Sequence, residues 1–323
     1  MKLSSFRPDV ADAAMLAVVL MWAANNILIK VTVDVLPPLP FVVGRFLIVI
    51  ALVWAWIAWR RLPARIALPD WPLLLVAGVF GFGIHNALFT IGMQHTSAFS
   101  AALLLSLSPI FTMLLARVIG MEHPSSAQWL ATGLAAAGVL VFVGDKLRVG
   151  GFGTAAVGDL LSLVSAFIFA VYSMAARPLT ARYGALVTTA WAVVVGLVTV
   201  APWGLGPALR EPWLMLPLPV WGSLFYAAAV SMLIGYSLWA WAMIRGGVAR
   251  TAPYLFLVPV ATGIMSALAL GEVFTPARIA GALMVLAGTM LVRVLGRNVV
   301  TAPATPEDAS APRPAVAVAR TAN

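Results

Sequence analysis

The sequence predicts an all-α, polytopic membrane protein whose ten transmembrane helices form two inverted five-helix repeats. Three observations favour this fold class. Of the 323 residues, 62% are hydrophobic and only 10% are charged, with a mean hydropathy of +1.01. Apolar runs of about 20 residues, the length that crosses a bilayer, recur along the whole chain. Rare residues also recur at a spacing of 150, as in Pro109 and Pro259.

This composition excludes a soluble enzyme. Soluble proteins carry about 25% charged residues, and a chain as apolar as this one could not cover its apolar surface in water. The net charge of +9 could indicate a nucleic-acid partner. However, the basic residues flank the apolar runs, so we interpret them as a cationic membrane face and expect no nucleic-acid partner. The absence of cysteine excludes disulfides and thiolate metal sites. We expect neither a metal nor a cofactor.

Charged, Pro-rich or Gly-rich breaks delimit the spans. Unbroken apolar runs favour helices over barrel strands, in which polar and apolar residues alternate. A signal peptide is an alternative for the first run, since Lys2 and Arg7 precede it, but the run is long and offers no convincing cleavage site. We therefore expect ten retained spans, at residues 12–32, 38–60, 71–93, 97–118, 125–144, 156–177, 183–204, 217–244, 248–270 and 276–296.

The basic residues set the orientation in the membrane. About 14 Lys and Arg residues fall on the side of the N-terminus and about 6 on the opposite side. Because basic loops stay in the cytoplasm, we expect residues 1–11 and the C-terminal tail to be cytoplasmic and the protein to lie in the cell (inner) membrane. The tail, residues 297–323, is rich in Ala, Pro and Thr and is predicted to be disordered.

The internal repeat divides the chain into residues 12–144 and 156–296, joined by a linker at 145–155. A shift of 150 also places Glu122 on Glu272, and a shift of 147 aligns the first span with the sixth. Five helices is an odd number, so the second copy would be upside down in the bilayer. Inverted repeats are typical of secondary transporters, whose substrate site lies near the midplane. An ancient duplication retained only for packing is the alternative.

Several short motifs occur in a characteristic order from the first span to the last. They are Trp22 with Asn25 and Asn26, Arg45, Ser108-Pro109, Glu122 with Gly133 and Gly138, Gly158-Asp159, and Glu272 with Gly281 and Gly288. In these motifs the chain resembles the EamA-type ten-helix members of the drug/metabolite transporter superfamily, and most of all the YddG-type exporters of aromatic and other neutral amino acids. The resemblance implies transport of small metabolites by alternating access, without ATP.

Polar and aromatic residues near mid-depth are the candidates for substrate binding, because polar groups are costly there unless they face the bundle interior. The repeat shifts pair these residues between the halves, for example Trp22 with Phe169 and Asn86 with Tyr236. The candidates are Trp22, Asn25, Asn26, His85, Asn86, Phe89, Phe169, Tyr172, Tyr236, Trp239 and Tyr254.

The chemistry of this set favours a small neutral or zwitterionic substrate. Amides, a histidine and tyrosine hydroxyls can bind an ammonium and a carboxylate, while aromatic rings stack on an apolar side chain. We expect no unpaired charged residue at mid-depth, since we place Arg45 at the membrane edge. A dianionic substrate would need cations there, and a polycation would need carboxylates.

Each candidate also has a structural interpretation. Trp22 and Trp239 could belong to interfacial belts, His85 could bond a neighbouring helix, and the two asparagines could join helices. Pro109 and Pro259 release backbone carbonyls and are predicted hinges, although simple kinks are an alternative. Glu122 and Glu272 are predicted to cap the fifth and tenth helices.

The sequence thus predicts a monomeric secondary transporter that exports aromatic and other apolar amino acids. Uniport and weak proton coupling through His85 are both open, because no carboxylate is expected inside the membrane. Efflux of another substrate class is an alternative. A channel and a scaffold protein are further alternatives. An intramembrane enzyme is the last, but Ser106 or Ser108 with His85 lacks an orienting third group, so we expect no enzyme.

Overall fold

The computed structural model describes residues 9–121, 123–150, 153–246 and 251–300, and within them it contains helices but no β-strand. Nine helical segments of this part of the chain have the length and hydropathy to cross a membrane. One of them, α8 (Thr154–Arg210), has 57 residues, about 85 Å of straight helix. It kinks at Gly184 (φ 79°, ψ 159°) and therefore supplies two spans. The described residues thus form the predicted polytopic helical fold with ten spans.

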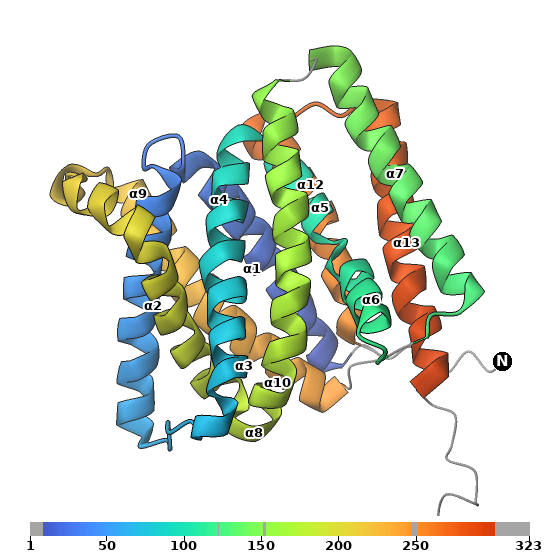
Figure 1. The fold of residues 1–323 in the computed structure, drawn as a ribbon. Coiled ribbons are helices and arrows are strands. Elements are labelled where there is room, and N and C mark those ends of the chain that lie inside the picture. Colours follow the sequence, from blue (N-terminus) through green and yellow to red (C-terminus); the bar gives the residue numbers. More distant parts are fainter. Residues whose placement is uncertain (1–8, 122, 151–152, 247–250, 301–323) are drawn as a thin grey trace, which may run out of the picture.

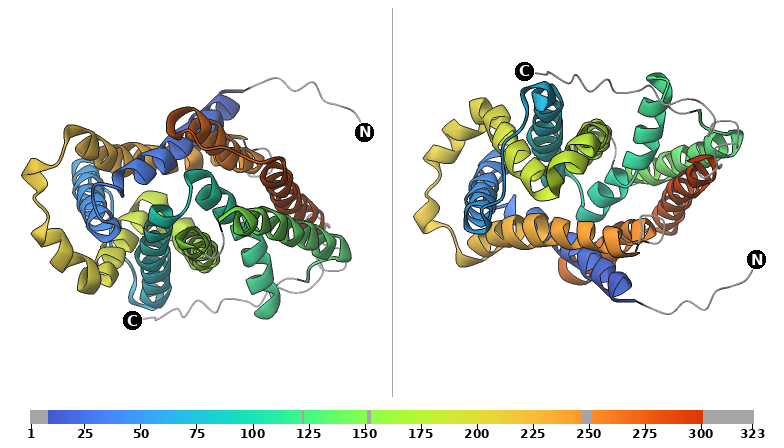
Figure 2. Two further views of the ribbon diagram at one scale, coloured as in Figure 1. Left: turned by 90° about the horizontal axis from the view of Figure 1, so that it is seen from above. Right: turned by 90° about the horizontal axis from the view of Figure 1, so that it is seen from below.

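The helices run up and down beside one another (Figure 1), with α7 and α13 together at one end of the bundle and α2 at the other (Figure 2). In chain order the elements are α1 (Val10–Thr32), α2 (Pro38–Arg60), η1 (Leu68–Asp70), α3 (Trp71–Val76), η2 (Ala77–Ile84), α4 (His85–His95), α5 (Ala98–Leu105), α6 (Ser108–Val118), α7 (Ser126–Gly150), α8, η3 (Trp213–Met215), α9 (Leu218–Phe225), η4 (Tyr226–Gly235), α10 (Tyr236–Gly246), η5 (Ala252–Phe256), α12 (Leu257–Leu270) and α13 (Pro276–Val300).

The break between the sixth and seventh spans and the predicted linker both differ from the sequence-based expectation. The helix continues through Pro178 and breaks at Gly184, because only glycine adopts a positive φ without steric cost. The predicted linker is largely helical, since α7 extends to Gly150 and α8 begins at Thr154. The connection between the halves is therefore short.

The third and eighth spans both contain a wide, π-helical segment in their middle. These segments are η2 and η4, and a shift of 150 carries the whole of η2 into η4. A π-helix shifts the hydrogen-bonding partners of the backbone and is often found at functional sites. Both halves therefore carry the same irregularity at the same place.

The fourth and ninth spans are interrupted at corresponding places. The fourth breaks between α5 and α6, and the ninth changes from the 3₁₀ turn η5 to α12. Pro109 is the second residue of α6 and Pro259 the third of α12. Proline fits the first turn of a helix because its missing N–H is unpaired there anyway, so each proline stabilises a restart of its helix.

Where α7 and α13 cross, each helix contacts the other through positions that correspond under the shift of 150. A Cβ on Gly138 would lie 2.7 Å from the carbonyl oxygen of Gly281, and one on Gly288 would lie 2.6 Å from that of Ala131. Positions 131 and 281, like 138 and 288, are 150 apart. A two-fold axis perpendicular to two antiparallel helices produces this correspondence.

The predicted terminal segments lie mostly outside the described residues. This holds for residues 1–8 of the N-terminal segment and 301–323 of the tail. Residues 297–300, which the sequence places in a disordered tail, instead continue α13 to Val300.

Candidate functional site

The first group of predicted residues gathers where α1 meets the eighth span. The rings of Trp22, Tyr236 and Trp239, which we call the Trp22 cluster, have centroids 5.3 to 6.3 Å apart. Trp22 Nε1 donates a hydrogen bond to the carbonyl of Ser231 in η4 at 3.2 Å. A Cβ on Gly235 would lie 2.9 Å from this nitrogen, so the glycine lets the indole approach η4 closely.

The second group lies where the third span meets α8. His85, Phe89, Phe169 and Tyr172 form the His85 cluster, in which the His85 and Phe169 rings are 4.9 Å apart and those of Phe169 and Tyr172 5.4 Å apart. His85 stacks on Phe89 at 6.0 Å. Trp22 and Phe169 are 147 apart, and Trp239 and Phe89 are 150 apart. The two clusters thus occupy repeat-related places.

His85 is held on one side of its ring. Its Nδ1 lies 2.7 Å from the hydroxyl oxygen of Ser165 and 3.1 Å from the Ser165 carbonyl oxygen. Nε2 has no hydrogen bond to the described residues. The bonds to Ser165 fit the structural interpretation, whereas the substrate or proton contact of the other nitrogen stays a prediction.

The two asparagines of α1 differ in their surroundings. The Nδ2 of Asn26 donates to the Thr262 hydroxyl of α12 at 3.2 Å, so its side chain joins two helices. The Oδ1 of Asn25 is buried and has no hydrogen-bond partner among the described residues. Asn25 is the better candidate for a ligand contact, since burying an unpaired polar atom costs about 1–3 kcal/mol.

Arg45 is the functional candidate that the sequence interpretation placed wrongly. It is the eighth residue of α2, about 10 Å from the start of the helix, and only 4% exposed. Its Nη2 donates to Oδ1 of Asn86 at 2.5 Å. Its Nε is buried without a hydrogen bond, and no carboxylate pairs with it among the described residues. The bundle interior therefore contains a cation.

Arg45 is connected to the His85 cluster through its neighbours. The Nδ2 of Asn86 donates to the Gly81 carbonyl, five residues earlier in the π-helical segment, at 3.0 Å. A Cβ on Gly81 would overlap the Tyr172 ring. Counting residues from the Pro37-Pro38 break would have revealed the depth of Arg45, because seven residues of helix exceed the interfacial layer.

Tyr254 shares an apolar neighbourhood with Trp239 of the Trp22 cluster. Both side chains pack on the apolar group of Ala14, Met15 and Ala242 near the beginning of α1. The Nε1 of Trp239 is buried without a hydrogen-bond partner among the described residues. Of the predicted set, Tyr254 thus extends the Trp22 cluster toward the end of the bundle where the chain begins.

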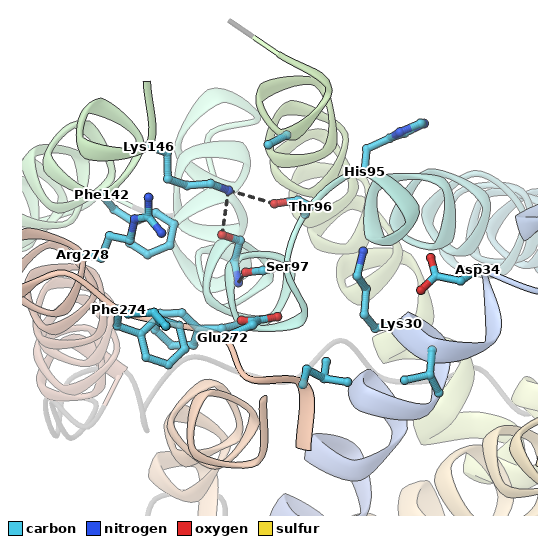
Figure 3. A pocket seen from close by; sticks show the side chains of 16 residues that line it. Lys30, Asp34, His95, Thr96, Ser97, Phe142, Lys146, Glu272, Phe274 and Arg278 are labelled. Atoms are coloured by element: carbon cyan, nitrogen blue, oxygen red, sulfur yellow. Dashed lines mark hydrogen bonds between the residues drawn. The ribbon is translucent and has the colours of Figure 1, made fainter. Parts of the chain in front are cut away.

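A cavity of about 520 Å³ lies at the opposite end of the bundle. We call it the outer pocket, and none of the predicted binding residues lines it (Figure 3). Its walls are the end of α1, the α4–α5 connection, the end of α7 and the α12–α13 connection. Its lining is mixed, with Lys30, Asp34, Lys146, Glu272 and Arg278 beside phenylalanine rings.

The position of Glu272 in this pocket corrects the predicted helix cap. Glu272 precedes α13 by four residues, and its Oε1 accepts a hydrogen bond from the Ala98 N–H of α5 at 3.1 Å. The hydroxyl of Thr275 instead accepts from the Arg278 N–H and caps α13. The repeat-related Glu122 lies outside the described residues.

Comparison with known proteins shows one family for both halves of the chain. Residues 10–144 and 156–294 each match the EamA-like transporter family. The chain is 31% identical to a probable terminal-alkyne amino-acid exporter of Streptantibioticus cattleyicolor, over 74% of this chain and 78% of the relative. It is 29% identical to a probable amino-acid metabolite efflux pump of Salmonella typhimurium, over 88% and 94% of the two chains.

A solved crystal structure of another protein has the same fold. It superposes with a TM-score of 0.60 and covers 90% of this chain and 98% of its own, at 21% sequence identity. At this identity the likeness concerns the arrangement of the helices alone.

Proposed function

Because the chain belongs to the EamA-like transporter family, we propose that it is a secondary transporter that exports amino acids with aromatic or other apolar side chains. The family and the named relatives are transporters, which makes this chain a transporter and not an enzyme. Two of the relatives are named as exporters of amino acids or their metabolites, and this supports the same substrate class here.

The observation that carries the substrate class is the buried guanidinium of Arg45. An arginine inside a membrane helix is costly, up to about 2.5–3.5 kcal/mol at the helix centre on insertion scales. The Asn86 amide and the Phe41 and Phe46 rings, 5.4 and 5.5 Å from the guanidinium carbon, offset part of that cost. The Nε remains free to donate to a substrate carboxylate.

The remaining parts of an amino acid also find complementary groups. The free Oδ1 of Asn25 is a hydrogen-bond acceptor for an ammonium. The Trp22 and His85 clusters offer ring faces and edges to an apolar or aromatic side chain. A zwitterion with an apolar side chain uses all three kinds of group, whereas a purely apolar compound would leave Arg45 unpaired.

Several features support alternating access between two inverted repeats. Both halves match one family, both contain a π-helical segment at the same position, and α7 and α13 exchange equivalent contacts. Inverted repeats bind substrate near the midplane and rock around it. In this proposal the termini are cytoplasmic, the protein is a monomer of the inner membrane, and Pro109 and Pro259 are the hinges.

The free Nε2 of His85 leaves two modes of energy coupling for the proposal. In uniport, this nitrogen only contacts the substrate. In weak proton coupling, it takes up and releases a proton during the transport cycle. Flux into liposomes that lack pH and sodium gradients separates the two modes, because only a uniporter equilibrates substrate at an undiminished rate there.

The function is tested by counterflow in proteoliposomes. Vesicles loaded with unlabelled phenylalanine should accumulate labelled phenylalanine transiently and saturably, and leucine, methionine and tryptophan should compete. Absence of counterflow for every such amino acid would contradict the proposed substrate class. Linear, unsaturable flux would indicate a channel.

The Arg45→Gln variant tests the proposed carboxylate contact. We expect phenylalanine to compete about 10- to 100-fold more weakly in this variant, because a hydrogen bond to a charged group contributes about 1.5–3 kcal/mol. Competition by phenethylamine, which has no carboxylate, should be unchanged. The control is Arg60→Gln, since Arg60 is exposed at the end of α2. Equal losses for both compounds would contradict the contact.

A further inference from the structure

We propose that the outer pocket is a second binding site for an amino-acid zwitterion, separate from the Trp22 and His85 clusters. The choice of an amino acid as its ligand rests on the proposed function, whereas the site itself follows from the pocket's own side chains. Its volume of about 520 Å³ falls within the range of about 300–1,000 Å³ typical of small-molecule sites.

Glu272 provides an unused anionic group. Its Oε1 accepts from the Ala98 N–H, and its Oε2 is buried without a hydrogen bond to any described residue. No ion pair joins this carboxylate to a cation in the described part of the chain. An unpaired carboxylate oxygen in a cavity is costly unless a ligand donates to it, and an ammonium is the fitting donor.

Most cations of the pocket are already neutralised. The ammonium of Lys146 donates to Thr96 at 2.9 Å, a bond drawn in Figure 3. It also donates to Ser100 at 3.0 Å and Asp159 at 2.6 Å, which uses all three of its hydrogens. Arg278 pairs with Asp145 through its Nε at 2.9 Å. These two ion pairs join the ends of α7, α8 and α13. Their cations therefore have little unpaired charge to offer a ligand.

Lys30 is the cation that keeps a free donor. Its ammonium donates to the carbonyls of Met93 and Gln94 at 3.0 and 3.3 Å, and no described carboxylate lies within ion-pair distance. One of its three hydrogens therefore remains for a ligand carboxylate. Lys30 and Glu272 enter the pocket from different walls, α1 and the segment before α13 (Figure 3).

Three phenylalanine rings complete the pocket. Phe99 contacts Phe274 with ring centroids 4.8 Å apart and Phe142 at 5.8 Å, both edge to face. All three residues line the cavity. An aromatic or large apolar side chain can pack on this surface, while the ammonium meets Glu272 and the carboxylate meets Lys30.

The absence of cysteine from the chain allows a direct binding measurement. Val273 lines the pocket and is 81% exposed, so Val273→Cys should react with a charged methanethiosulfonate in nanodiscs. We expect phenylalanine to slow this reaction. N-acetylphenylalanine and phenethylamine, which lack the ammonium and the carboxylate respectively, should each need about 10- to 100-fold higher concentrations.

Two charge-neutralising variants of the same cavity give a matched comparison. In the Val273→Cys background, Glu272→Gln should raise the half-protecting concentration of phenylalanine about 10- to 100-fold. Its amide oxygen can still accept from Ala98, so the α5 contact survives. Asp34→Asn, at an exposed residue of the pocket rim, should change that concentration less than about twofold, as for a screened surface charge.

A third variant separates the pocket from the central clusters. Protection of Val273→Cys should persist with Trp22→Ala. Three results would overturn the second site. They are no protection of Val273→Cys by phenylalanine, the same protection with Glu272→Gln as without it, and loss of protection with Trp22→Ala. Counterflow is measured in a separate experiment. If phenylalanine protects Val273→Cys but no counterflow is found, the proposed function is contradicted and the binding site in the outer pocket is still supported.

Discussion

Trp22 and His85 are the residues whose side chains do most to define the ring clusters. Trp22 contacts two rings of the eighth span and bonds η4, while His85 lies between Phe89 and Phe169. Each side chain thus contacts elements that are distant in sequence. Substrate contact by both side chains is therefore the prediction to test first.

We predict that Trp22→Ala lowers the counterflow rate about tenfold or more, because a buried aromatic side chain contributes about 2 kcal/mol or more to its contacts. Trp22→Phe should retain most of the rate, since one ring remains. The control is Trp59→Ala at a tryptophan that is 70% exposed. Unchanged kinetics in Trp22→Ala, at equal amounts of folded protein, would move the substrate site elsewhere.

His85→Ala should also lower the flux, and His85→Gln should recover part of it by bonding Ser165. The comparison separates the hydrogen bond to Ser165 from proton uptake, because a glutamine amide hydrogen-bonds but neither takes up nor releases a proton. If coupling to protons exists, both variants should lose the response of flux to an imposed pH gradient. A full response in His85→Gln would assign the coupling to another residue.

For single residues, the sequence predicted which side chains belong to the two ring clusters better than it predicted their individual hydrogen bonds. Trp22, His85 and Tyr236 could be found by their mid-depth positions. The difference between Asn25 and Asn26 could not, because it depends on the partner Thr262 in a helix more than 200 residues away. Arg45 was misplaced because a basic residue in the first third of a span resembles an interfacial one.

Glycines at helix crossings set how closely the elements approach. A Cβ on Gly81 would overlap the Tyr172 ring, so Gly81→Ala should destabilise the fold by about 1–3 kcal/mol through overpacking. Gly133→Ala is the matched control, because a Cβ at this position would have no neighbouring atom within 4 Å. Thermal unfolding in detergent, followed by circular dichroism, should show a lower midpoint for the first variant alone. Equal midpoints would mean that the α8 contact is loosely packed.

The elements themselves were predicted well in position and less well in detail. Hydropathy locates the spans because each must satisfy its own backbone hydrogen bonds in lipid. Pro109 signals the interruption between α5 and α6 in the sequence, whereas the π-helical segments leave no hydropathy signal, since most of their residues are apolar. They arise from packing between helices, which composition does not record.

At the scale of the whole molecule, α7 and α13 provide a test of the pseudo-symmetry. Ala in place of Gly138 or Gly288 should cause similar losses of stability, about 1–3 kcal/mol each, because both would press on the partner's backbone. Gly144→Ala, with nothing within 4 Å, should be neutral. Unfolding midpoints of the three variants provide the comparison. A severe effect at one symmetric position and none at the other would contradict the two-fold relation.

Leu68 and Leu218 can show whether the two halves of the chain are inverted in the bilayer. They are 150 apart, are 83% and 82% exposed, and stand at the start of the third and eighth spans. In the cysteine-free chain, Leu68→Cys and Leu218→Cys can each be labelled with a membrane-impermeant maleimide in intact bacteria. We predict rapid labelling at 218, and labelling at 68 only after the cells are permeabilised. Labelling of both positions from the same side would contradict the inverted arrangement.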